Sequence, residues 1–278
     1  MIDAHQHFWQ LGRGDYAWPT AGEAAIFRDF GPDDLAPLLT RAGVRQTVLV
    51  QATPSVAETR YLLALAGRTP FVAGVVGWAD LTAPDAVATI EGLRADPALK
   101  GLRPMLQSIA ETDWILQPAA GTALRHMAKA GLRLDALIQP RHLAAIATLA
   151  RRHPDLAIVI DHIAKPRMGA GIAPDALWQR GMSALAALPN VWCKLSGMIT
   201  EIGPDWRPAD LTAHAAHVLA GFGPGRVMWG SDWPVVNLAG DYGSWAEQAR
   251  ALTAGLSRTE AAQVFGGTAR AFYGLAQA

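Results

Sequence analysis

The chain opens on MIDAHQH (residues 1–7), a short apolar run that ends in two histidines. Seven further runs rich in valine, isoleucine and leucine follow, separated by longer alanine- and leucine-rich stretches with helical periodicity. Alternation of this kind indicates repeated βα units and hence a parallel sheet. An open doubly wound sheet more often has about five or six strands. The count of eight therefore favours a closed (β/α)8 TIM barrel.

We predict one domain over residues 1–278, because no linker, charge block or low-complexity segment divides the chain. A long loop is expected over 9–31, and an extra C-terminal helix near 258–273 is expected to pack outside the closed ring. The predicted strands are 1–7, 44–51, 71–78, 100–106, 132–139, 157–162, 191–196 and 227–232. The predicted helices between and after them are 32–42, 55–68, 84–95, 117–130, 140–152, 174–188, 208–221 and 242–254.

The composition excludes several classes of protein. Lysine and arginine total 24 and aspartate and glutamate total 24, so the basic excess of a nucleic-acid-binding protein is missing. No apolar run reaches the ~18 residues of a membrane span, and strand pattern begins too near Met1 for a signal peptide, so we expect a cytoplasmic protein. The single cysteine, Cys193, excludes an intrachain disulfide and lies in a strand pattern typical of a buried, inert thiol.

Polar residues recur where the predicted strands end, which is where barrel enzymes carry their active sites. His5 and His7 lie two apart on one strand, so both imidazoles should project from the same face. Asp232 stands where the last strand breaks into a turn, and we interpret it as a general base or metal ligand rather than a helix cap. His162 should emerge at the rim, whereas strand alternation predicts that only one of His162 and Asp161 faces the interior.

Arg103 interrupts the fourth strand pattern, and an arginine inside a barrel is costly unless it meets an anion. We predict that it clamps a substrate carbonyl or carboxylate; a structural salt bridge, for example to Asp80, is the alternative. The remaining polar residues near strand ends are candidates for binding substrate, and the sequence does not rank them. These are Gln51, Trp78, Gln139, Lys194 and Asn237.

Taken together, these motifs resemble the amidohydrolase superfamily over essentially the whole chain, and more narrowly its sugar-lactonase branch. The resemblance implies a TIM-barrel hydrolase that opens the ring of a sugar-acid lactone, with a small-molecule substrate as its partner and homo-oligomerisation left open. The segments that carry it are IDAHQHFW (2–9), GDYAW (14–18), KGLR (100–103), DHIAKP (161–166), KLSG (194–197) and WGSDWP (229–234).

Binuclear members of the superfamily use a bridging Lys or Glu on the fourth strand and a His on the fifth, where this chain has Arg103 and Gln139. A binuclear centre is therefore not expected. The candidate metal set is His5, His7 and Asp232, joined by His162, and it supports either one divalent ion or none. Imidazole and carboxylate ligands favour Zn²⁺ if a metal is bound.

The mechanism we predict has Asp232 take a proton from the water that attacks the lactone carbonyl, while His5, His7 and His162 stabilise the oxyanion and Arg103 orients the substrate. Two alternatives remain at this point. One is a metal-dependent non-oxidative decarboxylase of an aromatic or heteroaromatic acid, since similar decarboxylases share the paired histidines and the late aspartate. The other is a non-catalytic sugar-binding barrel.

Overall fold

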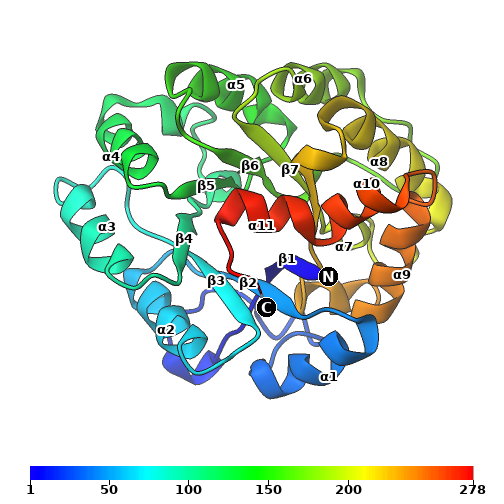
Figure 1. Cartoon of the computed structure of the whole chain (residues 1–278), viewed down its shortest axis with the longest axis horizontal. Helices are drawn as coiled ribbons and strands as arrows, with labels where there is room; N and C mark the ends of the chain where they lie inside the picture. Colours follow the sequence, from blue (N-terminus) through cyan, green and yellow to red (C-terminus); the bar gives the residue numbers. More distant parts are fainter. Residues whose placement is uncertain (278) are drawn as a thin grey trace.

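A computed structural model describes residues 1–277, and in that range eight parallel strands form one sheet in sequence order. The ring closes beyond the last strand, where Asp232 N donates to His5 O at 2.8 Å and His7 N donates to Trp233 O at 2.7 Å. The barrel prediction is therefore confirmed (Figure 1). The strands are β1 (Ile2–Gln6), β2 (Gln46–Val50), β3 (Val72–Gly77), β4 (Leu99–Leu102), β5 (Arg133–Ala136), β6 (Ile158–Ile160), β7 (Val191–Leu195) and β8 (Val227–Trp229).

Helices surround the ring and cover the outer face of the strands (Figure 1). Several begin as the sequence predicts, with proline in the first turn, where its missing N–H costs nothing. Eight of them lie within the predicted helical stretches to within a residue. They are α1 (Pro32–Ala42), α2 (Val56–Ala66), α3 (Ala86–Arg94), α4 (Pro118–Lys129), α5 (Leu143–Arg152), α6 (Ala176–Ala186), α8 (Pro208–Phe222) and α9 (Tyr242–Leu252). The short α7 (Met198–Ile202) follows β7 and has no counterpart in the prediction.

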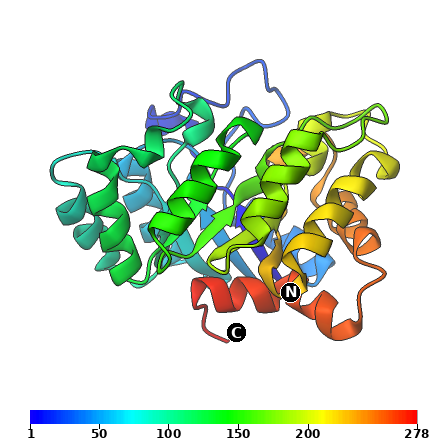
Figure 2. The same cartoon turned by 90° about the horizontal axis from the view of Figure 1, so that it is seen from above.

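The C-terminal helical segment consists of α10 (Arg258–Ala262), a π-helical stretch (Gln263–Gly267) and α11 (Thr268–Tyr273). It does not lie against the outer ring of helices. Instead α11 runs across the N-terminal end of the barrel, on the side opposite the loop that joins β1 to α1 (Figure 2). Phe272 and Tyr273 are buried against interior residues of the strands, such as Val48 and Met228. The helix thus closes the bottom of the barrel core.

Side chains alternate along the strands, as a barrel requires. Val48 and Val50 of β2 belong to the interior cluster, whereas Leu49 packs outward against the helices. The interior also holds charged groups in the same layer, namely Asp135 of β5 and Lys194 of β7, both fully buried. These two residues connect the closed bottom of the barrel to the site at the other end.

Candidate active site

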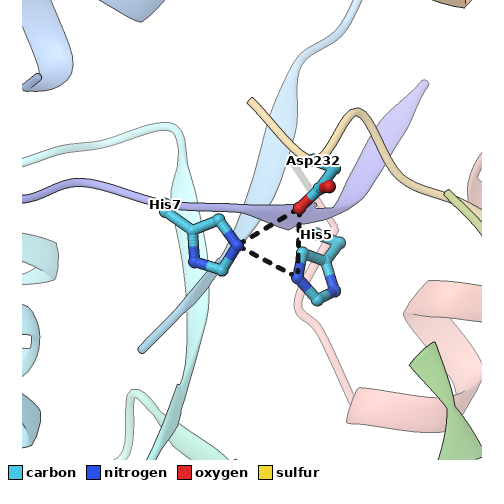
Figure 3. A group of neighbouring side chains, drawn as sticks. All are labelled: His5, His7 and Asp232. Atoms are coloured by element: carbon cyan, nitrogen blue, oxygen red, sulfur yellow. Dashed lines mark hydrogen bonds and ion pairs between the residues drawn. The ribbon is translucent and has the colours of Figure 1, made fainter. Parts of the chain in front are cut away.

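His5 of β1 and His7, directly after that strand, meet Asp232 (Figure 3). His5 Nε2 lies 3.2 Å from His7 Nε2, and Asp232 Oδ1 lies 3.3 Å from His7 Nε2 and 3.7 Å from His5 Nε2. All three side chains are buried. The prediction that both imidazoles project from one face of the strand is confirmed. His5 Nε2, His7 Nε2 and Asp232 Oδ1 form a triangle of two nitrogens and one oxygen.

The backbone around Asp232 is held by residues of β1. Asp232 itself has φ +58°, a left-handed conformation that aspartate tolerates better than most residues. Asp3 accepts hydrogen bonds at Oδ1 from the backbone of His5 (3.1 Å) and Ser231 (2.8 Å), and at Oδ2 from the Tyr242 hydroxyl (3.0 Å). Asp3 therefore links the first strand to the turn after the last strand and fixes the position of Asp232 relative to His5.

His162, in the turn after β6, approaches the same oxygen, with Nε2 3.8 Å from Asp232 Oδ1 and Nδ1 2.9 Å from Ser196 Oγ. The expectation that only one of Asp161 and His162 faces the interior is wrong. From His162 to Lys165 every residue has a positive φ, so the chain makes a left-handed turn directly after the strand. That turn breaks strand alternation and brings both side chains into the site.

Arg103 is buried and pairs with Asp161, not with Asp80: its Nη1 lies 3.3 Å from Asp161 Oδ2. The same Nη1 lies 3.4 Å from His5 Nε2, so the guanidinium borders the triangle. Gln51 holds it from the other side, accepting from Nη2 through its backbone carbonyl and through Oε1 at 3.0 Å. Arg103 Nε has no hydrogen-bond partner among the described residues, which leaves a buried donor for a substrate.

The structure places two of the predicted substrate-binding residues behind the site rather than in it. Gln51 is fully buried and engages Arg103 at both ends of its amide. Lys194 is also fully buried, and its ammonium contacts Asp135, Asp161 and His5. The polar atoms of both side chains are bonded to other buried residues. Long polar residues at a strand end can thus serve the barrel interior as well as its mouth.

The other three candidates contact residues outside the triangle. Gln139 is exposed and accepts from Arg141 Nε at 3.3 Å. Trp78 is partly buried after β3, where its backbone binds Thr59. Asn237 lines a hollow of ≈ 630 Å³ between α1 and α9. Among residues 1–277, no hydrogen bond or ion pair joins the side chains of these three to His5, His7 or Asp232.

Burial and charge set the protonation states of the cluster. Burial lowers the pKa of His162 to about 4, and burial with the nearby Lys194 ammonium holds the pKa of His5 well below its usual range. Burial alone would raise the pKa of Asp232, but the charge of His162 and the hydrogen bond from His7 outweigh it and hold that pKa below its usual range. At neutral pH the site therefore presents the Asp232 carboxylate beside the neutral imidazoles of His5 and His162.

The triangle also fits a metal ion. His7 Nδ1 donates to Val50 O at 2.8 Å, because a carbonyl oxygen only accepts, and Nε2 lies 3.3 Å from Asp232 Oδ1. Nε2 is therefore the nitrogen of His7 that would bind a metal. Ligands around a tetrahedral Zn²⁺ stand ~3.3 Å apart, given bond lengths of about 2.0–2.1 Å. The observed edges of 3.2, 3.3 and 3.7 Å match that spacing.

A (β/α)8 barrel with two histidines at the end of its first strand and an aspartate after its last defines a class of enzymes whose active site lies at the C-terminal end of the barrel. The chain belongs to the amidohydrolase family, whose model matches residues 2–275. The superfamily resemblance inferred from the motifs is thereby confirmed.

Two named proteins and one solved structure are similar to this chain over nearly its whole length. A Burkholderia ambifaria protein named L-fucono-1,5-lactonase is 50% identical over 98% of this chain and 94% of its own length. A Burkholderia multivorans protein of the same name is 35% identical over 99% of this chain and 96% of its own length. A crystal structure of an amidohydrolase from Burkholderia multivorans with bound Zn superposes with a TM-score of 0.92, at 35% identity and 99% coverage of both chains.

Sequence reasoning missed the residues that support the cluster from below and behind, chiefly Asp3, Asp135 and Tyr242. Asp135 carried a usable signal, since a charged residue within the apolar run LRLDALI (132–138) must find a partner inside the barrel. Tyr242 carried none, because an aromatic residue at the start of a helix ordinarily packs against the core.

Proposed function

We propose that the chain is a carboxylic-ester hydrolase that opens the ring of a sugar-acid lactone, with L-fucono-1,5-lactone as the first substrate to test. The observation that carries the proposal is the buried Asp232 carboxylate surrounded by three imidazoles and bordered by Arg103. The relatives named as L-fucono-1,5-lactonases cover nearly the whole chain. A decarboxylase or a non-catalytic sugar-binding barrel is not favoured.

In the mechanism that we propose, Asp232 accepts a proton from a water molecule as the water oxygen bonds to the lactone carbonyl carbon. N–H groups of the surrounding imidazoles and of Arg103 face the carbonyl oxygen as it gains negative charge. The intermediate then breaks its bond to the ring oxygen, which takes the proton back from Asp232. The product hydroxy acid ionises in solution and releases the proton that an assay detects.

A bound Zn²⁺, held by His5, His7 and Asp232, would polarise the carbonyl or lower the pKa of the water. Arg103 and His162 would keep the same roles with or without the ion. The buried Arg103 Nε, which lacks a partner in the structure, is the donor best suited to the lactone carbonyl or a neighbouring hydroxyl.

The test is a panel of aldonolactones that includes L-fucono-1,5-lactone, assayed with a pH indicator before and after treatment with a chelator. We expect acid release well above spontaneous hydrolysis for at least one lactone. Acid release no faster than the uncatalysed reaction across the panel would refute the proposal. Activity that survives chelation would also count against the decarboxylase, which requires its metal.

Further parts of the proposal concern the molecule as a whole. We propose one domain over residues 1–278 and a cytoplasmic location; homo-oligomerisation stays open, and gel filtration with light scattering would measure it. Cys193 is buried, so the fold needs no oxidising compartment. Among the described residues, no helix is both long and apolar enough to cross a membrane.

A further inference from the structure

We propose that Trp178 is a positioning residue for the reaction, because its indole N–H holds the left-handed turn that brings Asp161 and His162 into the site. The inference rests on the proposed function, in which His162 borders the Asp232 carboxylate. Trp178 belongs to α6, in the layer of helices outside the strands (Figure 1), so it acts on the site through the turn.

The turn directly after β6 has a backbone conformation that its residues disfavour. His162, Ile163, Ala164 and Lys165 have φ values of 51°, 49°, 62° and 47°, and none of them is glycine. A left-handed residue brings its Cβ close to the following carbonyl oxygen, and a β-branched residue such as Ile163 tolerates this least. Contacts from the surrounding structure must therefore stabilise the turn.

Trp178 supplies a hydrogen-bond donor that the turn itself lacks. Within the turn, Lys165 N donates to His162 O, three residues back, at 2.8 Å. The next bond of that series would need an N–H at Pro166, and proline has none. Trp178 Nε1 instead donates to Ile163 O at 2.8 Å in a buried contact. Because a buried carbonyl without a partner is costly, the indole N–H favours the conformation that directs Ile163 O toward it.

Trp178 is fixed through both its backbone and its ring. Asp175, the N-cap of α6, accepts from Trp178 N at 3.2 Å and from Leu177 N at 2.8 Å. The indole ring packs against the imidazoles of His214 and His217 on α8, with a centroid distance of 5.2 Å to each. These contacts leave the indole little freedom to turn its N–H away from the carbonyl that it binds.

Both side chains that the turn presents are used at the site. His162 Nε2 lies 3.8 Å from Asp232 Oδ1, and Asp161 Oδ2 lies 3.3 Å from Arg103 Nη1. A return of Ile163 to the right-handed or extended region would change the direction of the chain beside both of them. One of the imidazoles around Asp232 and the partner of Arg103 would then move together. The indole N–H thus affects catalysis through geometry.

The first test is Trp178→Phe, which keeps an aromatic ring against α8 but removes the N–H. We expect kcat to fall about 10- to 10²-fold, as for a catalytic group displaced by about 1 Å, with a smaller change in KM. Trp206→Phe is the matched control, because it loses the same kind of bond, to Ala239 O at 2.9 Å, outside the turn, and should keep the wild-type kcat. A folded Trp178→Phe protein with the wild-type kcat would overturn the proposal.

A second substitution separates the hydrogen bond from the loss of packing. Glycine adopts a positive φ readily, so Ala164→Gly relaxes the turn at φ 62° and removes only a buried methyl group. Adding Ala164→Gly to Trp178→Phe should raise kcat by about threefold or more relative to Trp178→Phe alone. A double variant with no higher kcat would mean that Trp178 acts by packing alone, against the proposal.

The turn can also be followed without substrate, through hydrogen exchange of the Lys165 amide that donates to His162 O. In Trp178→Phe we expect this amide to exchange about tenfold faster or more, relative to the amide of Val75, which donates to Ala98 O between β3 and the start of β4. A general loss of stability would raise both exchange rates alike, and that result would overturn the proposal.

A milder variant decides the question if Trp178→Phe does not fold. Asp175→Ala removes an exposed N-cap and leaves most of the stability in place. We expect faster exchange at Lys165 and a lower kcat in Asp175→Ala but not in Ser257→Ala, which loses the equivalent cap of α10. Equal results for the two variants would overturn the proposal. Wild-type protein that hydrolyses no lactone would refute the proposed function, and the exchange rates would still test Trp178.

Discussion

Replacing Asp232 by asparagine should remove catalysis while leaving the fold in place. The side chain is 6% exposed, and its Oδ1 lies within 3.3 to 3.8 Å of three imidazole nitrogens. Asparagine keeps the shape and one oxygen acceptor but cannot accept the proton of water. Loss of a positioned general base costs about 10²–10⁴-fold, or ~3–5 kcal/mol of transition-state stabilisation. We therefore expect kcat to fall by that factor and KM to change by only a few-fold.

The assay is acid release from the best lactone of the panel, followed with a pH indicator after subtraction of spontaneous hydrolysis. Circular dichroism of the variant and its thermal transition show whether it has folded. Asp241→Asn is the matched control, because Asp241 is an exposed N-cap of α9 and asparagine caps a helix about equally well. A folded Asp232→Asn protein with kcat within tenfold of wild type would refute the assignment of the base.

Three more predictions follow from the surroundings of the site. Burial raises the pKa of Glu58 from 4.5 to about 7, so this group stabilises the fold below pH ~4.5 and that stability is lost as the pH rises to about 7. The free energy of unfolding of Glu58→Gln should therefore rise by about 2–3 kcal/mol relative to wild type between pH 4.5 and 8, measured by urea unfolding. A difference that does not change with pH would contradict this. Gly197→Ala would place a Cβ 2.5 Å from His162 Nδ1 and should lower kcat at least tenfold. Gly223 has a similar positive φ but open space around it, so Gly223→Ala should cost only ~1–2 kcal/mol of stability. Equal kcat values for the two variants would contradict the prediction that the Cβ displaces His162. Tyr273→Phe removes a hydrogen bond to a buried carboxylate and should lower the free energy of unfolding by ~1.5–3 kcal/mol in the same urea assay; an unchanged value would mean that α11 closes the barrel by apolar contact alone.

The sequence predicted the barrel well because its signals are local and repeated. The predicted helix 32–42 coincides with α1 (Pro32–Ala42), since Pro32 at the first turn and Gly43 after the last residue mark both ends. Strands were predicted too long at their C-terminal ends: β6 stops at Ile160, two residues early, because the chain turns there to present Asp161 and His162. The position of α11 could not be predicted, because an amphipathic helix does not encode which end of a barrel it will cover.

The site was predictable where it follows strand geometry and unpredictable where it departs from that geometry. The two-residue spacing of His5 and His7 was sufficient to place both rings on one face. A left-handed run of four residues without glycine, from His162 to Lys165, has no sequence signature, and the interior of the barrel imposes it through contacts such as that of His162 with Ser196. Lys194 was assigned to the substrate because its position at a strand end does not reveal the two carboxylates buried behind it.

Whether the triangle holds a metal depends on which ring nitrogens can accept. His7 Nδ1 donates to the carbonyl of Val50, so Nε2 is the nitrogen of His7 that would bind a cation. Both nitrogens of His5 face a cationic side chain, with Lys194 Nζ 3.1 Å from Nδ1 and Arg103 Nη1 3.4 Å from Nε2. A divalent ion on His5 Nε2 would therefore meet the repulsion of the guanidinium, whereas the anionic oxygen of a lactone intermediate would be stabilised by the same group. The two histidines with Arg103 beside them thus suit the developing oxyanion of lactone hydrolysis.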